Sequence, residues 1–223
     1  MDNFAFVSDF DGTLTDRDFY HIVIDKYLKD WGRQFYEDWK RTSKINVDFL
    51  NRIFGAMDRS ESEIYEDILN LPFDRFAQNF INEVGERGGK FFILSAGTSY
   101  YIDILLEHLN IKGVTVISMK GIYKDRGIEI IPDKNGRYYS DIFGLDKRKV
   151  IEELKREYKC VLFAGDSEPD LAAAKAADFA FAKAELADLL KKEGADFIPF
   201  KNYSEIKDFM DKKGWKLDEE PGA

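Results

Sequence analysis

The N-terminal segment reads Phe4-Ala5-Phe6-Val7-Ser8-Asp9-Phe10-Asp11-Gly12-Thr13-Leu14-Thr15. Its apolar first half predicts a buried strand, so the two aspartates lie just beyond the carboxyl end of that strand. In an open α/β sheet, ligands bind in the crevice at this end of the strands. Gly12 allows the sharp backbone turn that lets both carboxylates face the crevice. The segment therefore predicts an α/β fold with a site for phosphate and metal chemistry.

Two other interpretations of this Asp-x-Asp-Gly pattern deserve comparison. A calcium-binding EF-hand loop needs Gly at its sixth position and Glu at its twelfth. Counted from Asp9, those positions hold Leu14 and Tyr20, so an EF-hand is excluded. An ordinary turn also favours Asp and Gly, for backbone reasons alone. That alternative weakens because other expected strand ends carry residues of matching chemistry.

Composition narrows the class of protein. The chain has 223 residues, of which 44% are hydrophobic, enough for a buried core. The formal net charge of −9 argues against a nucleic-acid surface, which would show a basic patch. A single cysteine, Cys160, excludes an intramolecular disulfide. Since no signal peptide and no stretch of ~20 apolar residues is seen, we expect a cytoplasmic protein with no nucleic-acid or membrane partner. No oligomeric state is predicted.

A long helical segment separates the first motif from the rest of the chain. Residues 16–87 are rich in helix formers and aromatic residues at spacings of three and four, with no clear strand. After Gly88, helical patterns alternate with short apolar runs, at residues 91–94, 114–117, 128–131, 161–164, 179–181 and 197–198. This alternation implies a parallel sheet with right-handed crossovers. We predict an α/β, Rossmann-like core (residues 1–15 and 88–223), an inserted helical cap (residues 16–87) and a flexible tail (residues 215–223).

Three later segments also carry polar residues at positions where this fold binds ligands. Ser95 ends one expected strand, Lys147 starts a helix, and Asp166 with Asp170 follows another strand. Lys147 offers a point charge for phosphate oxygens, and Ser95 with the backbone N–H groups after it can donate hydrogen bonds. Carboxylates such as Asp9 and Asp166 are the hard oxygen ligands that Mg²⁺ takes.

These residue types suit phosphoryl transfer through an aspartyl-phosphate. Attack by a carboxylate on phosphorus divides a difficult hydrolysis into two easier displacements. Asp11 is placed to protonate the leaving oxygen. The metal and the lysine would offset the repulsion between the carboxylate and the phosphate.

The chain resembles the haloacid dehalogenase superfamily of phosphatases over nearly its whole length. The four motifs of that superfamily are matched in order by Asp9-Phe10-Asp11-Gly12-Thr13, Ile93-Leu94-Ser95-Ala96-Gly97, Lys147 and Gly165-Asp166-Ser167-Glu168-Pro169-Asp170. The first and fourth motifs are the most specific. The resemblance implies a core of this superfamily, Mg²⁺ as cofactor and a small phosphorylated metabolite as substrate.

The resemblance also implies individual roles. Asp9 would be the nucleophile and a metal ligand, and Asp11 the general acid/base, ligating metal through its backbone carbonyl. Asp166 would be the other carboxylate ligand, with Asp170 supporting the metal site at one remove. The implied phosphate-binding residues are Gly12, Thr13, Ser95, Ala96, Gly97 and Lys147. Lys147 is preferred over Lys149 because it matches the family pattern, and Lys149 stays open as the alternative.

The second aspartate discriminates within the superfamily. Dehalogenases resemble the first motif but lack this acid, because a halide leaving group needs no proton. An alkoxide leaving group gains from one. Asp11 therefore points to phosphate esters.

The helical segment between the first two motifs resembles the cap of the phosphoserine phosphatase-like branch. In that branch, residues matching Asp18 and Arg52 would bind the amine and carboxylate of the substrate, although Asp18 is a shorter acid than the branch's Glu. A closer resemblance is to the methionine-salvage phosphatases of 2-hydroxy-3-keto-5-methylthiopentenyl 1-phosphate. It rests on Asn51-Arg52-Ile53-Phe54-Gly55, Ala164-Gly165-Asp166-Ser167, Ala172-Ala173-Ala174-Lys175, Phe179-Ala180-Phe181-Ala182-Lys183 and Ile198-Pro199-Phe200.

Other functions stay open from the sequence. A phosphoserine or phosphocholine-like phosphatase would use the same residues on another ester. A phosphomutase would use the same nucleophile and acid but return the phosphate to a sugar. A non-catalytic phosphate-binding module is the remaining alternative, although every residue the chemistry needs is present.

Overall fold

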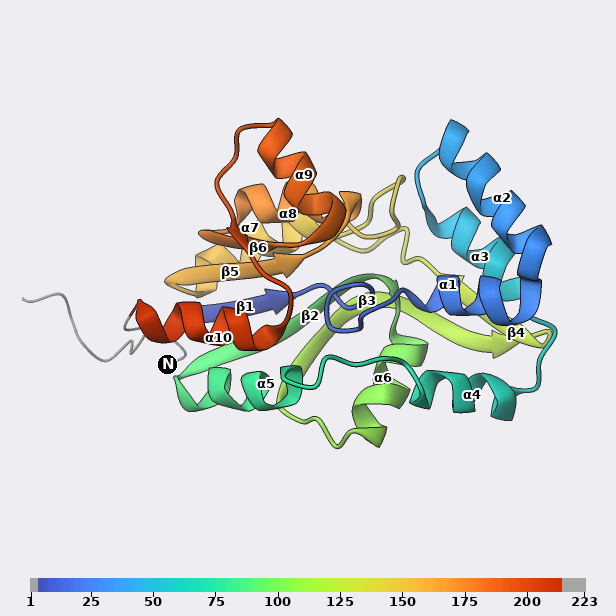
Figure 1. The fold of residues 1–223 in the computed structure, drawn as a ribbon, viewed down its shortest axis with the longest axis horizontal. Helices are drawn as coiled ribbons and strands as arrows, with labels where there is room; N and C mark the ends of the chain where they lie inside the picture. Colours follow the sequence, from blue (N-terminus) through green and yellow to red (C-terminus); the bar gives the residue numbers. More distant parts are fainter. Residues whose placement is uncertain (1–3, 214–223) are drawn as a thin grey trace, which may run out of the picture.

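The computed structural model of the chain describes residues 4–213, and a seven-stranded sheet forms its centre (Figure 1). The strand order is β4-β3-β2-β1-β5-β6-β7. The strands are β1 Phe4–Ser8, β2 Gly89–Thr98, β3 Val114–Lys124, β4 Gly127–Ile131, β5 Cys160–Gly165, β6 Phe179–Ala182 and β7 Ile198–Pro199. Neighbouring strands are parallel except β3 and β4. The predicted tail, residues 215–223, lies outside the described residues.

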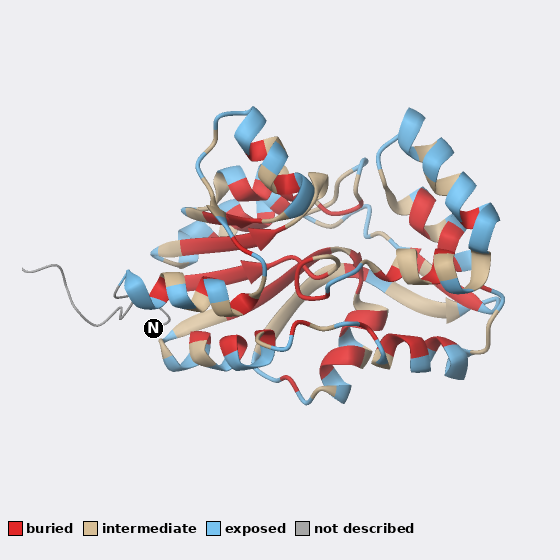
Figure 2. Cartoon of the chain, viewed as in Figure 1, coloured by how far each residue is buried: buried red, intermediate tan, exposed pale blue. Residues whose placement is uncertain are grey.

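Helices cover both faces of the sheet. Successive side chains of a strand point to opposite faces, so the apolar strands present apolar side chains to the helices on each face. In β1, Phe4 and Phe6 join one hydrophobic cluster, and Ala5 and Val7 join the other. The first face packs against α5 Ala77–Glu86, α6 Ser99–His108 and α10 Tyr203–Lys212, and the second against α7 Lys147–Glu157, α8 Leu171–Ala176 and α9 Ala184–Lys192. Burial on both faces explains the continuous apolar runs of the central strands (Figure 2). The predicted α/β fold, a mostly parallel sheet flanked by helices, is confirmed.

The edge formed by β3 and β4 differs from the sequence prediction. The strand expected at residues 114–117 continues to Lys124 and turns through Asp125 and Arg126, which have φ values of 47° and 63°. The chain then returns antiparallel as β4, whose residues match the extended segment expected at 128–131. Residues 118–124 mix polar and apolar side chains, so they lack the apolar run by which the other strands were recognised.

The chain between β1 and β2 forms helices, as its periodicity predicts. They are α1 Phe19–Val23, a π-helical segment Ile24–Leu28, α2 Lys29–Thr42, α3 Val47–Gly55, α4 Glu61–Leu69 and α5. The first three helices lie beyond the carboxyl ends of β1 and β5, whereas α4 packs against α6 and α5 against β2 (Figure 1). The division into a core and a cap at residues 15/16 and 87/88 stays a prediction.

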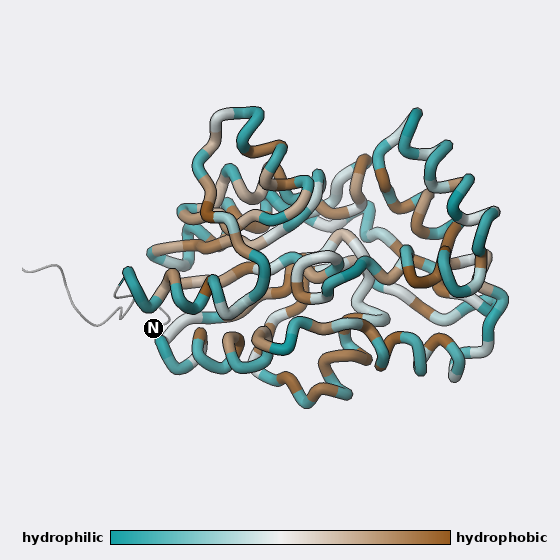
Figure 3. Tube along the Cα trace, viewed as in Figure 1, coloured by the Kyte–Doolittle hydropathy of each residue, from teal (hydrophilic) through white to brown (hydrophobic). Residues whose placement is uncertain are grey.

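The helix α3 is the main link between this helical segment and the sheet. Phe49 and Phe54 of α3, with Met57 just after it, are buried in the hydrophobic cluster that continues under the sheet. The neighbouring α2 is mostly hydrophilic along its length (Figure 3). The apolar face of α3 therefore joins these helices to the core without a break in packing.

Asn51 pairs with the outer backbone edge of β4, the edge that faces away from β3. Its side-chain amide donates to the carbonyl of Ile130 at 3.1 Å and accepts from the N–H of Ile130 at 2.7 Å. An unpaired strand edge invites association with other chains, and a side-chain amide that satisfies both groups blocks it.

We expect Asn51→Ala to lower the free energy of unfolding by about 1–3 kcal/mol, because the N–H and C=O of buried Ile130 lose their partner. The melting temperature should fall by about 2–4 °C for each kcal/mol. Thermal unfolding by circular dichroism measures it. Asn79→Ala, on the exposed side of α5, is the matched control. Equal losses in the two variants would show that the pairing with Ile130 contributes nothing specific.

Candidate active site

The register of the sheet brings the predicted site residues to one edge. Ser8, the last residue of β1, pairs with Ile93 of β2 and with Ala164 of β5. Asp9, Ser95 and Asp166 each lie one or two residues beyond these partners. Because the three strands are parallel and adjacent, all three side chains reach the same crevice at the carboxyl ends.

Lys147 places a positive charge at the carboxyl ends of these strands. Its Nζ donates to Asp9 Oδ1 at 2.5 Å and to Asp170 Oδ1 at 2.6 Å. The side chain is only 3% exposed, and it starts α7, whose first turn is capped by the carboxylate of Asp146. Burial disfavours the charged ammonium, but Asp170 and Asp9 outweigh that effect and raise the pKa of Lys147.

Lys149 has a different environment. Its Nζ donates to the carbonyl of Tyr139 at 3.3 Å and lies 3.8 Å from Asp146 Oδ2, with half of the side chain exposed. The two lysines are two positions apart on a helix, a rotation of about 200° around its axis. The structure thus brings Lys147, and not Lys149, to the carboxylates.

Asp170 organises the loop after β5. Its Oδ2 accepts from the backbone N–H groups of Asp166 at 3.0 Å and Ser167 at 3.2 Å, while Oδ1 accepts from Lys147. The residue is fully buried. With its oxygens engaged in this way, Asp170 is suited to hold the loop of Asp166 in position.

Asp166 faces the turn that follows β1. Thr13 Oγ1 donates to Asp166 Oδ1 at 3.0 Å. Gly12 has φ +78°, and a Cβ added there would lie 2.4 Å from Asp166 Oδ2. Only glycine permits this close approach of the backbone to the carboxylate. Lys183, a residue that sequence reasoning gave no role, donates to the carbonyl of Thr13 at 3.2 Å.

Asp9, Asp166 and Asp170 could hold a divalent cation. Each offers a carboxylate oxygen, and these oxygens lie within 4.8 Å of one another. Together with Asp11 they make four carboxyl groups at the site against the ammonium of Lys147. Buried charges require compensation, and carboxylate oxygens are ligands of hard cations, so the donor set fits a metal such as magnesium.

The burial and proximity of these carboxyl groups shift their pKa values. Burial raises the pKa of Asp9 well above its ordinary value, although Lys147 opposes the shift, and burial also raises the pKa of Asp11. Burial and the carboxylate of Asp170 raise the pKa of Asp166 to about 7. Without a further cation, burial in the site therefore favours the protonated form of these carboxyl groups.

Asp11 is held by hydrogen bonds on both of its oxygens. The N–H of Phe19 donates to Oδ1 at 3.1 Å, and the hydroxyl of Tyr101 donates to Oδ2 at 2.6 Å. Ser95 Oγ lies 3.5 Å from the same Oδ2 and accepts from the N–H of Gly97 at 2.9 Å. Motif-two residues and the first motif therefore meet at Asp11.

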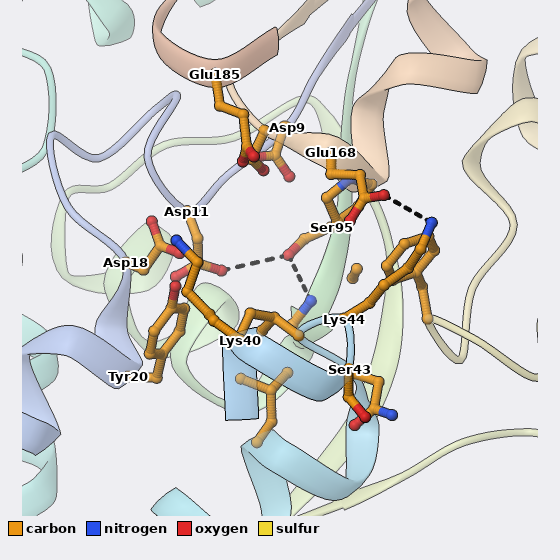
Figure 4. A pocket seen from close by; sticks show the side chains of 18 of the residues that line it. Asp9, Asp11, Asp18, Tyr20, Lys40, Ser43, Lys44, Ser95, Glu168 and Glu185 are labelled. Carbon is orange, nitrogen blue, oxygen red and sulfur yellow. Dashed lines mark hydrogen bonds and ion pairs between the residues drawn. The ribbon is translucent and has the colours of Figure 1, made fainter. Parts of the chain in front are cut away.

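A cavity of about 500 Å³ opens from these residues toward α1, α2 and α3. Asp9, Asp11, Ser95, Ala96, Gly97 and Lys147 line its inner end. Asp18, Tyr20 and Lys40 lie on one side, and Lys44 on the other forms an ion pair with Glu168 at 2.6 Å (Figure 4). The cavity also has apolar lining residues, which are Ile45, Leu50 and Phe143.

The two specificity candidates have different positions. Asp18 lines the cavity, and burial together with the carboxylate of Asp11 raises its pKa to about 8. Arg52 is exposed, lies 5.9 Å over the ring of Trp39 and lines a separate pocket. Leu50 faces the active-site cavity, and a residue two positions later on α3 is rotated by about 200°. The structure therefore does not bring Arg52 to the site.

Sequence reasoning missed several groups that face the cavity. Lys40 and Lys44 lie at the end of α2 and in the loop after it, where a run of polar residues looks like any solvated helix end. Tyr101 lies on α6 in an apolar helical pattern, so the sequence marks it as a core residue. Only the tertiary structure distinguishes these residues from their neighbours.

No helix within residues 4–213 is long and apolar enough to cross a membrane.

Comparisons with known proteins agree with this geometry. A protein of Bacillus velezensis named 2-hydroxy-3-keto-5-methylthiopentenyl-1-phosphate phosphatase is 26% identical over 206 residues, which cover 90% of this chain and 87% of the relative. A Bacillus pumilus protein of the same name is 22% identical over 204 residues, covering 89% and 87%.

Solved structures agree as well. A substrate-bound phosphoserine phosphatase has a TM-score of 0.69 at 17% identity, covering 94% of this chain and 99% of that one.

The sequence-family model of the haloacid dehalogenase-like hydrolases matches residues 5–178 of this chain. The resemblance drawn from the four motifs is thus confirmed, and the chain belongs to the haloacid dehalogenase-like hydrolase family.

Proposed function

We propose that this hydrolase is a Mg²⁺-dependent phosphomonoesterase that acts on a small metabolite through an aspartyl-phosphate. One observation carries the proposal: buried Lys147 joins Asp9 to Asp170 beside Asp166, at the inner end of a cavity that Asp11 also lines. A nucleophile, an acid, a cation and a candidate metal site are then within reach of one phosphate group.

In the first step, an oxygen of Asp9 forms a bond to phosphorus while the bond from phosphorus to the ester oxygen breaks. Asp11 gives its proton to that ester oxygen, which leaves as an alcohol. Burial raises the pKa of Asp11, which favours the protonated form that this step requires. Lys147, Ser95 and the N–H groups of the turn after β2 stabilise the phosphate oxygens.

In the second step, water attacks the phosphorus of the aspartyl-phosphate and gives a proton to Asp11. The bond between phosphorus and the Asp9 oxygen breaks, which releases inorganic phosphate and restores both aspartates. The role of Asp11 thus reverses between the two steps. When bound, Mg²⁺ supplies positive charge that lowers the repulsion between Asp9 and the phosphate.

The residues assigned to Mg²⁺ are Asp9 and Asp166, with the backbone carbonyl of Asp11. Asp170 supports them, because its oxygens already accept three hydrogen bonds. The phosphate-binding residues in this proposal are Gly12, Thr13, Ser95, Ala96, Gly97 and Lys147.

The proposed substrate is a methylthiopentenyl phosphate of the kind named for the Bacillus relatives. The cavity supports it with an apolar wall of Ile45, Leu50 and Phe143 that would suit a thioether tail. The polar side, with Asp18, Tyr20 and Lys40, would suit hydroxyl and carbonyl oxygens. A phosphoserine phosphatase is less well supported, since Arg52 lies outside the cavity.

We expect the metal-free protein to lose stability as pH rises from about 6.5 to 8. In this range Asp166 and Asp18, with pKa values of about 7 and about 8, still bind protons in the folded state but not in the unfolded state. The native state then binds more protons, so the free energy of unfolding falls with pH. Burial lowers the pKa of His21 from 6.5 to about 4, which has the opposite effect; that effect acts mainly below pH 6.5 and fades within about one pH unit above it.

Magnesium should displace the proton of Asp166 and therefore raise the melting temperature more at pH 8 than at pH 6.5. Thermal unfolding with EDTA and with Mg²⁺ at both pH values measures the effect. Asp166→Asn is the control that should remove most of the magnesium shift. An equal shift at both pH values, or one that survives Asp166→Asn, would contradict the assigned metal site.

The two lysines of α7 provide a matched pair of variants. We expect Lys147→Met to lower kcat by at least about 10²-fold, since it removes a buried donor to the phosphate. Lys149→Met should leave kcat/KM within about twofold of the wild type. Thermal unfolding in Mg²⁺ shows whether each variant is folded. A loss confined to Lys149→Met would reverse the assignment.

The proposed function is tested by a hydrolysis screen over phosphate esters. The panel contains p-nitrophenyl phosphate, phosphoserine, phosphocholine, sugar phosphates and a methylthiopentenyl phosphate analogue. We expect release of inorganic phosphate, loss of turnover with EDTA and loss by at least about 10³-fold in Asp9→Asn. A sugar phosphate isomer in place of inorganic phosphate would instead identify a phosphomutase. Full activity in Asp9→Asn is incompatible with the aspartyl-phosphate.

A further inference from the structure

The hydroxyl of Tyr101 is directed at the proposed general acid. Tyr101 lies on α6, is 2% exposed, and donates to Asp11 Oδ2 at 2.6 Å. This tyrosine lies outside the four motifs of the family resemblance. A hydroxyl in an apolar core needs a partner, and here the partner is a group that must move a proton.

The packing around Tyr101 restricts the position of its hydroxyl. The ring of Tyr101 packs against the rings of Phe10, Phe19 and Phe54, at centroid distances of 5.9, 5.2 and 6.3 Å. A Cβ added at Gly97 would lie 1.8 Å from the hydroxyl oxygen, so glycine is required there. The phenol therefore has little freedom to leave Asp11 while these rings are packed.

Two hydrogen bonds, one to each oxygen, hold the carboxyl group of Asp11 in one orientation. Oδ1 accepts from the N–H of Phe19 and Oδ2 from Tyr101, so rotation of the carboxyl group would break both bonds. Ser95 Oγ, at 3.5 Å from Oδ2, is a weaker partner. Without the phenol, Asp11 would be held firmly through one oxygen only.

From this geometry we propose that Tyr101 is a positioning residue, which fixes the carboxyl group of Asp11 in the orientation that delivers its proton to the leaving oxygen. The hydroxyl of Tyr101 bonds Asp11, and we assign its effect on the reaction to that contact. Its ring contacts Phe19 of α1 and Phe54 of α3, so the alignment of the acid depends on the packing of these helices against the sheet.

The inference rests on the proposed phosphatase function and is tested by leaving-group dependence. Phenyl phosphate has a more basic leaving group than p-nitrophenyl phosphate and gains more from protonation. We expect Tyr101→Phe to lower kcat about tenfold for phenyl phosphate but less than about threefold for p-nitrophenyl phosphate. KM should stay within about twofold for both esters, because only the transition state loses an interaction.

Tyr100→Phe is the matched control. Tyr100 is the neighbouring tyrosine on α6, and its hydroxyl bonds Glu61 Oε1 at 3.1 Å, away from Asp11. This variant should turn over both esters at wild-type rates. Phenylalanine keeps the ring at either position, and thermal unfolding verifies that both variants are folded.

A double-mutant cycle with Asp11→Asn gives the second measurement. If Tyr101 acts through Asp11, Tyr101→Phe should have no further effect on phenyl phosphate once Asp11 is replaced. Equal losses with the two esters, no loss, or multiplied losses in the double variant would each overturn the positioning role. No turnover of either ester by the wild type would overturn the proposed function and the inference together, whereas turnover with equal losses overturns the inference alone.

Discussion

The burial of several carboxyl groups beside one ammonium is the constraint on which the site depends. Asp9 and Asp170 are nearly inaccessible to water, and both accept from Lys147. Removing charges from water costs several kcal/mol for each ion unless partners compensate it. The backbone N–H groups that bind Asp170 and the hydroxyl of Thr13 beside Asp166 provide part of that compensation. The remaining imbalance is what a divalent cation and its phosphate ligand would correct.

The close packing of these carboxyl groups explains the sharp turn of the backbone beside them. Carboxylates can approach one another only where the chain turns sharply, which is why Gly12 lies against Asp166. Behind them, Ser8 donates to the carbonyl of Asp9 at 2.5 Å and bonds Tyr203 of α10. The strand that carries Asp9 is thereby fixed from the helix layer below it. A rigid scaffold of this kind holds reacting groups within the small tolerance that catalysis needs.

The sequence located the three central strands and brought their polar residues together, because parallel register is a simple rule. Apolar runs located β1, β2 and β5, and the polar residues after them had to meet. Lys147 was selected over Lys149 by family pattern, whereas helix geometry supplies the physical reason. The structure does not bring Arg52 to the cavity, and the sequence could not show this because a position within a helix does not tell which face meets the cavity. Tyr101 was hidden for a related reason, since an apolar helical pattern describes a buried residue but not its hydrogen bond.

The side chains at the inner end of the cavity are held more firmly than those at the outer end. At the inner end, each side chain is held by buried partners, so a small displacement would leave charges unpaired. At the outer end, Lys40 and Lys44 are exposed, and the ion pair from Lys44 to Glu168 joins side chains that are 50% and 38% exposed. Exposed ion pairs contribute little energy and rearrange readily. In the proposed function, substitutions there would change which leaving group fits without disturbing the reaction, so the motifs would determine the chemistry while α2 and the loop after it would select the substrate.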